Sequence, residues 1–227
     1  MSTRRHLARV GAVAALAGAP MLFVATLLHP MSADPNDAPA AFAEYAADPI
    51  WVASHLGQFL GFAALAVALV AVAGTVEAGA PAAWAWIGVV GTAASVAAAA
   101  ALQAVDGIAL KVMVDRWARA TGEARARAFE GAFAVRQIEV GMASLLGVLS
   151  GLTVTVLGVA MLRSRRFPDW LGGAGLLGGL GTIAAGMAQA YTGFSPLAMA
   201  LSMPAGSFLL VWAIAVGASL WRLAGAL

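Results

Sequence analysis

Long apolar runs separated by short polar or proline-containing segments dominate the pattern of the chain. A helix needs about 20 apolar residues to cross the hydrocarbon of a membrane, and six runs are about that long. They lie near residues 9–29, 52–74, 84–105, 139–162, 170–190 and 198–221. None alternates strictly as a barrel strand would, which favours helices. We therefore expect an all-α fold, a polytopic bundle of six transmembrane helices that forms a single domain over residues 1–227.

The composition supports a membrane location. Of the 227 residues, 62% are hydrophobic and only 11% are charged, and the mean hydropathy is +0.87. This balance lies far from that of a soluble domain. The sequence contains no cysteine, which excludes disulfides, thiolate metal sites and iron–sulfur clusters within it.

Basic residues indicate the orientation of the spans. They gather before the first run and between the fourth and fifth runs, at Arg4, Arg5, Arg9, Arg163, Arg165 and Arg166. Cytoplasmic segments carry such an excess, so we expect both termini in the cytoplasm and, given the Arg-, Ala- and Gly-rich composition, a bacterial cytoplasmic (inner) membrane. The acidic, Pro- and Ala-rich segment 29–51 fits an external loop. The arginines flank apolar runs and form no patch, so nucleic acid is not an expected partner.

The segment 106–131 is polar but keeps a helical pattern. Apolar residues recur among its charges, and a Thr-Gly step at 121–122 interrupts them. We predict that spans three and four continue beyond the bilayer as an external helical hairpin. The alternative is a helix that lies in the headgroup region.

Polar residues recur at one predicted depth. At 1.5 Å per residue, the polar residues of five helices lie about 28–36 Å from the cytoplasmic boundary. Several are separated by three residues and so share a helix face. The prediction is an outward-facing polar pocket at the outer leaflet lined by His55, Gln58, Gln103, Asp106, Arg136, Glu139 and Gln189. The alternative is a solvated rim of the bundle, where polar side chains are ordinary.

Acid–base and metal chemistry each have candidates in this layer. Arg136 and Glu139 are expected to form a salt bridge. Under a catalytic hypothesis, Glu139 and Asp106 would exchange protons with an apolar substrate. His29 and His55 could ligate a haem, and together with Asp106 or Glu139 they would make a minimal zinc site. Neither histidine has a recognisable ligand spacing, so no metal or other cofactor is expected.

Small residues indicate where helices approach closely. The motifs Gly147-xxx-Gly151 and Gly175-xxx-Gly179 lie in the fourth and fifth runs. Such spacing lets backbones touch, and we expect it to serve packing within the bundle. The alternative is an interface in a homo-oligomer or with another membrane protein.

Short motifs along the chain support a resemblance. In order, they are WVASHLGQFLGF, DGIALKVMVDRWA, AVRQIEVG, RRFPDWLGG, GFSPL and LWRL. With these, the chain from about His29 to Arg222 resembles a group of small bacterial six-span proteins described only as a domain of unknown function. The resemblance implies the fold and the membrane location, and it brings no catalytic residues.

Four functions remain open at this point. The polar pocket favours a protein that binds a membrane lipid or an amphiphilic small molecule, in a sensing or accessory role. A membrane-embedded acid/base enzyme acting on an isoprenoid- or lipid-like substrate is the first alternative. A haem- or metal-binding protein and a structural subunit are the others, so the sequence leaves enzymatic activity undecided.

Overall fold

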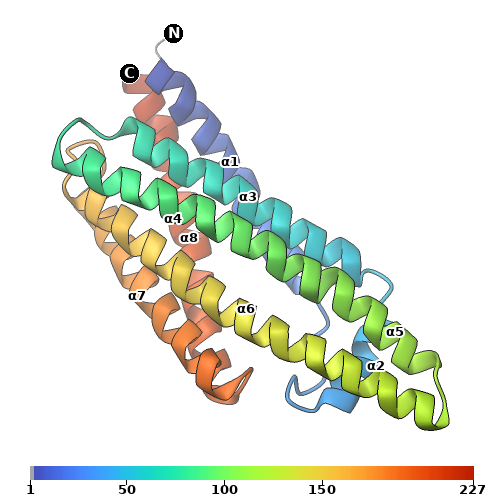
Figure 1. Cartoon of the computed structure of the whole chain (residues 1–227). Coiled ribbons are helices and arrows are strands. Elements are labelled where there is room, and N and C mark those ends of the chain that lie inside the picture. The colour runs from blue at the N-terminus through green and yellow to red at the C-terminus, as the bar shows by residue number, and fades with distance from the viewer. Residues whose placement is uncertain (1–2) are drawn as a thin grey trace.

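The computed structural model describes residues 3–227, which form helices joined by short connections and contain no strand (Figure 1). The helices are α1 (Thr3–Leu27), α2 (Ala38–Ala47), α3 (Trp51–Thr75), α4 (Ala80–Gln103), η1 (Ala104–Leu110), α5 (Lys111–Arg119), α6 (Gly122–Leu162), α7 (Asp169–Thr192) and α8 (Pro196–Ala226). With α4, η1 and α5 counted as one continuous helix, six of the described helices are long and apolar enough to cross a membrane. The predicted all-α fold with six transmembrane helices is confirmed.

The third and fourth spans are longer than the apolar runs that predicted them. The continuous helix Ala80–Arg119 has 40 residues and α6 has 41. Charged residues ended the predicted spans, but charges do not interrupt the backbone hydrogen bonds of a helix. The chain reverses at Gly122, whose φ of +53° suits glycine, and α5 packs against α6. The two helices thus form a hairpin, and its place outside a membrane stays a prediction.

The segment predicted as an external loop contains a helix, α2. The Asp37 side chain accepts a hydrogen bond from the Ala40 N–H at 3.2 Å, and Pro39 occupies the first turn. Both features are typical helix starts. Phe42 and Tyr45 are buried in a cluster that includes residues of α3, η1, α5 and α6. α2 therefore covers the end of the bundle that lies away from the start of α1 and the end of α8 (Figure 1).

Glycines let α6 and α7 touch along their length. A Cβ atom added at Gly151 would lie 2.6 Å from the Gly179 carbonyl oxygen, and one at Gly158 would lie 2.8 Å from the Gly172 carbonyl oxygen. Only residues without a side chain permit this approach. The glycine motifs of these helices therefore serve packing within the chain, as predicted.

α1 packs against both α3 and α8, but its contact with α8 does not extend along its whole length. Near its start it packs on α8, where Gly217 approaches Ala15. Farther along it stays on α3, where Gly61 approaches Leu22, whereas α8 packs on α7, where Gly178 approaches Phe208. α1 and α8 consequently diverge toward the α2 end of the bundle (Figure 1).

The α6–α7 contact predicts a difference between two glycines of α6. Gly151→Ala places a methyl group against backbone atoms of α7, whereas the Cβ of Gly141→Ala meets no atom within 4 Å. We expect Gly151→Ala to lower the free energy of unfolding by about 1–3 kcal/mol, the usual cost of overpacking. Thermal unfolding in mild detergent, followed by circular dichroism, measures both variants. Equal melting temperatures for the two would show that the contact is looser than described.

Candidate functional site

Six of the seven residues predicted to line a polar pocket form three pairs. The contacts are His55 Nε2 to Asp106 Oδ2 at 3.1 Å, Gln103 Nε2 to Gln58 Oε1 at 3.2 Å, and Arg136 Nη1 to the Glu139 carboxylate oxygens at 2.8 and 2.6 Å. The first two pairs join α3 to the continuous α4–η1 helix, and the third lies within α6. The predicted salt bridge in α6 is confirmed, and both of its side chains are buried.

Aromatic rings enclose the two histidines at this end of the bundle. The ring centroids of Tyr45 and Trp51 are 4.3 Å apart, and those of Trp51 and His55 are 4.4 Å apart. His29 completes the stack at 4.7 Å from Trp51 and 5.0 Å from His55. Sequence reasoning missed Tyr45 and Trp51. Both aromatic residues lie within the segment 29–51, and its assignment as an external loop concealed their role.

Tyr45 connects the ion pair of α6 with the histidines. The Arg136 guanidinium carbon lies 5.5 Å from the centre of the Tyr45 ring and 4.6 Å from that of Phe194. Burial raises the pKa of the Tyr45 phenol to about 12, and the Glu139 and Asp106 carboxylates add to this rise while Arg136 opposes it. The phenol is therefore neutral at physiological pH, and both acidic groups lie within electrostatic reach of it.

His29, His55 and Asp106 are the described residues that could hold a metal ion. Each offers one ligand atom, and these atoms lie within 4.8 Å of one another. Burial lowers the pKa of His29, and the neighbouring His55 imidazole lowers it further. The neutral, metal-binding form of His29 is thus favoured. One Asp106 oxygen, Oδ1, is buried without a hydrogen-bond partner.

A π-helical turn places Asp106 beside His55. The helix widens over Ala104–Leu110, and such turns are frequent at functional sites. A Cβ atom at Gly107 would lie 2.5 Å from the Cβ of His55, so glycine permits the approach. The Trp51 indole Nε1 donates to the Asp106 carbonyl oxygen at 3.2 Å. The sequence pattern gave no signal for this turn.

Lys111 of α5 binds the carboxyl end of α2 through hydrogen bonds. Its Nζ donates to the carbonyl oxygens of Tyr45 and Ala46 at 2.9 and 3.0 Å and pairs with Asp115 at 2.9 Å. A cation at the carboxyl end of a helix is also favoured by the helix dipole. Sequence reasoning did not identify this contact, because it joins segments far apart in the chain.

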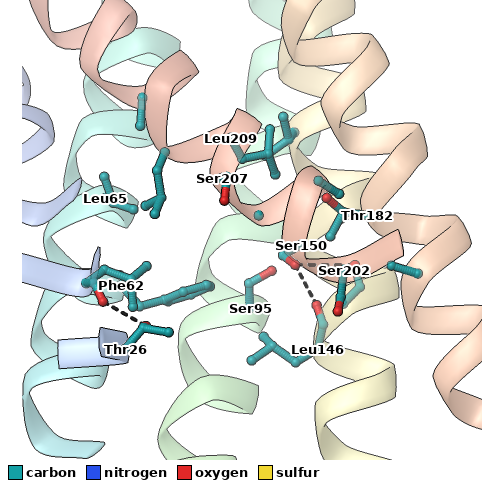
Figure 2. Close-up of a pocket in the computed structure, with 18 of the residues that line it drawn as sticks. Thr26, Phe62, Leu65, Ser95, Leu146, Ser150, Thr182, Ser202, Ser207 and Leu209 are labelled. Atoms are coloured by element: carbon teal, nitrogen blue, oxygen red, sulfur yellow. Dashed lines mark hydrogen bonds between the residues drawn. The ribbon is translucent and has the colours of Figure 1, made fainter. Parts of the chain in front are cut away.

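A large cavity lies between the helices, next to the polar pairs. It measures about 570 Å³ and is lined by residues of α1, α3, α4, α6, α7 and α8 (Figure 2). This volume is that of a ligand pocket, about 300–1,000 Å³. The described residues that line it include no Asp, Glu, Lys, Arg or His.

Several hydroxyl groups of the cavity wall already donate hydrogen bonds within their own helices. Thr26 donates to the Leu22 carbonyl at 2.8 Å and Ser150 to that of Leu146 at 2.6 Å (Figure 2). Thr182 donates to the Gly178 carbonyl at 2.8 Å. These bonds lie within single helices, so the hydroxyls add little polarity to the wall.

Of the seven predicted pocket residues, Gln189 alone lines this cavity. Its Nε2 lies 3.5 Å from the Val140 carbonyl oxygen. Leu102 and Met31, which also line the cavity, are close in sequence to Gln103 and His29. The Oε1 atom of Gln103 is buried without a hydrogen-bond partner. The apolar cavity therefore ends near the polar pairs, and none of the six paired residues lines it.

Together the fold and the site define a multi-pass α-helical membrane protein with an internal apolar cavity. The family described as "Domain of unknown function (DUF4386)" matches residues 12–217, and the chain belongs to this family. No curated protein and no solved structure matched the chain. The resemblance to six-span proteins of unknown function is confirmed.

The buried ion pair predicts an asymmetry between single and double variants. Glu139→Gln leaves the Arg136 guanidinium buried without its counter-charge, and we expect a loss of about 3–5 kcal/mol in the free energy of unfolding. Changing both residues to Met removes both charges, so that variant should recover much of the loss. Denaturation in detergent measures both.

A matched control lies in the same helix. Glu123 and Arg127 form an ion pair at 3.2 Å with both side chains largely exposed, so Glu123→Gln should change stability little. If Glu139→Gln were as stable as Glu123→Gln, the buried Arg136–Glu139 ion pair would contribute nothing to folding.

Proposed function

We propose that the protein binds a membrane lipid or another amphiphilic small molecule, in a sensing or accessory role. The apolar chain of the ligand occupies the cavity between the helices, and its head group points to the polar residues at the α2 end. The observation that carries this proposal is the size of the cavity together with the absence of charged residues among those that line it.

The physics of the bilayer limits what the cavity can select. Moving an acyl chain from lipid into an equally apolar cavity gains little hydrophobic free energy. Affinity must therefore come from shape and from polar contacts at the head group. Gln189 at the cavity wall and the unpartnered Oε1 of Gln103 favour a head group that carries an O–H or N–H donor.

Access from the bilayer fits the divergence of α1 and α8. Phe23 and Leu27 of α1 and Met203 of α8 line the cavity. They are also 48%, 58% and 52% exposed, respectively. Within a membrane, side chains exposed on spanning helices face lipid. A lipid chain would enter sideways between the two helices, without crossing the aqueous phase.

The arginine distribution supports an orientation for this site. The arginines of residues 4–9 and 163–166 lie at the helix ends opposite the α2 end, and by the positive-inside rule they favour an orientation with both termini in the cytoplasm and the polar residues at the outer leaflet of a bacterial inner membrane. The hairpin of residues 106–131 at the α2 end also carries five basic residues, but four acidic residues accompany them. A catalytic role for Glu139 is less favoured, because Arg136 engages both of its carboxylate oxygens.

Filling the cavity should expel the ligand. Gly206 lines the cavity, and a Cβ atom there meets nothing within 4 Å, so Gly206→Phe can project into it without displacing the backbone. We expect roughly a tenfold or greater loss of affinity, since overlap with a packed ligand costs about 1–3 kcal/mol. Native mass spectrometry after extraction in mild detergent measures the fraction of chains that retain a lipid-sized mass.

Gly225→Phe is the matched control, because Gly225 lies in the same helix, is equally free of neighbours, and is outside the cavity. Equal retention by both variants, or no retained mass on the unmodified protein, would refute the proposal.

A further inference from the structure

We propose that His29, His55 and Asp106 form a binding site for a late first-row divalent metal cation such as Zn²⁺. The three side chains come from the segment after α1, from α3 and from η1, and their ligand atoms lie within 4.8 Å of one another. Zinc binds such donors at about 2.0–2.2 Å. His29 lies outside a helix, so a small movement of its ring can bring all three donor atoms within bonding distance of one central ion.

Both imidazoles are held as metal ligands are. His29 Nδ1 lies 2.8 Å from the Pro30 carbonyl oxygen, and His55 Nδ1 lies 2.7 Å from that of Trp51. A carbonyl oxygen only accepts, so each Nδ1 carries the hydrogen and each Nε2 offers a lone pair. Metal-bound histidines almost always donate their second ring N–H to a carboxylate, a backbone carbonyl or a water.

One oxygen of the Asp106 carboxylate has no partner, and the other faces a ring nitrogen of His55. His55 Nε2 lies 3.1 Å from Oδ2, and with the ring hydrogen on Nδ1 both atoms are acceptors. Oδ1 is buried without any hydrogen-bond partner. A proton on Nε2 would satisfy only the first contact. A metal cation would satisfy both oxygens and would also engage His29.

The surroundings of the cluster are rigid, as a metal site needs. Trp51 is fully buried and makes two of the orienting contacts, through its carbonyl to His55 and through its indole to the Asp106 carbonyl. Gly107 allows η1 to lie against the His55 ring. The Asp106 side chain is 15% exposed, which leaves a path for an ion.

The donor set selects the class of metal. Two imidazole nitrogens and a carboxylate suit Zn²⁺, Fe²⁺ and their neighbours, whereas Mg²⁺ and Ca²⁺ prefer oxygen ligands alone. Three protein ligands leave a coordination position free for water or another ligand. The metal site does not depend on occupation of the apolar cavity.

The test compares histidines within the full chain. The third histidine of the sequence, His6, is exposed in α1 and remote from the cluster, so His6→Gln is the control. The purified protein is stripped with a chelator, loaded with Zn²⁺, freed of excess metal and measured by mass spectrometry of the element. We expect about one Zn²⁺ per chain in the unmodified protein and in His6→Gln, and a loss of at least tenfold in affinity in His29→Gln and Asp106→Asn.

Two further measurements separate metal binding from folding. Without metal, His29→Gln should melt as the unmodified protein does, and Zn²⁺ should raise the melting temperature of the unmodified protein alone. Co²⁺ should give visible absorption bands that His29→Gln lacks. Equal Zn²⁺ content in all variants, or none in the unmodified protein, would overturn the metal site. Gly206→Phe should keep its metal, so this result is independent of the lipid proposal.

Discussion

Close contact between helix backbones at small residues is the constraint from which the architecture follows. Lipid chains are as apolar as the side chains of the helices, so burial alone does not select helix neighbours within a membrane. Glycines fix α1 on α3 and α6 on α7, and the two pairs are joined by α4, which contacts α3 and α6, and by α8, which contacts α1 and α7. The pairs then separate, and the cavity is the space that side chains between them leave unfilled.

The polar end of the bundle is organised by different forces. There Trp51 contributes its ring, its indole N–H and its carbonyl, and it thereby joins α2, α3 and η1 around the histidines. Lys111 adds a charge at the end of α2. Directional hydrogen bonds and stacking define geometry here, whereas shape defines it in the cavity. The molecule thus combines a precise polar end with a permissive apolar interior.

Local patterns were predictable from the sequence, and contacts between distant segments were not. Run length and hydropathy suffice for the six spans, and the three-residue spacing of Arg136 and Glu139 suffices for their salt bridge. His29, His55 and Asp106 come together only because α3 pairs with a helix whose π-turn rotates Asp106 toward it. No spacing along the chain encodes that rotation. The seven polar residues were predicted to line one pocket; six of them form three pairs in the structure, and Gln189 lines the apolar cavity.

The divergence of α1 and α8 has a consequence for what such a cavity can report. Its exposed lining residues, Phe23, Leu27 and Met203, lie on spanning helices. A ligand that arrives through the membrane is governed by its mole fraction among the surrounding lipids, and dilution of the external medium does not change that quantity. If the proposed ligand binding holds, occupancy would accordingly follow the make-up of the bilayer itself.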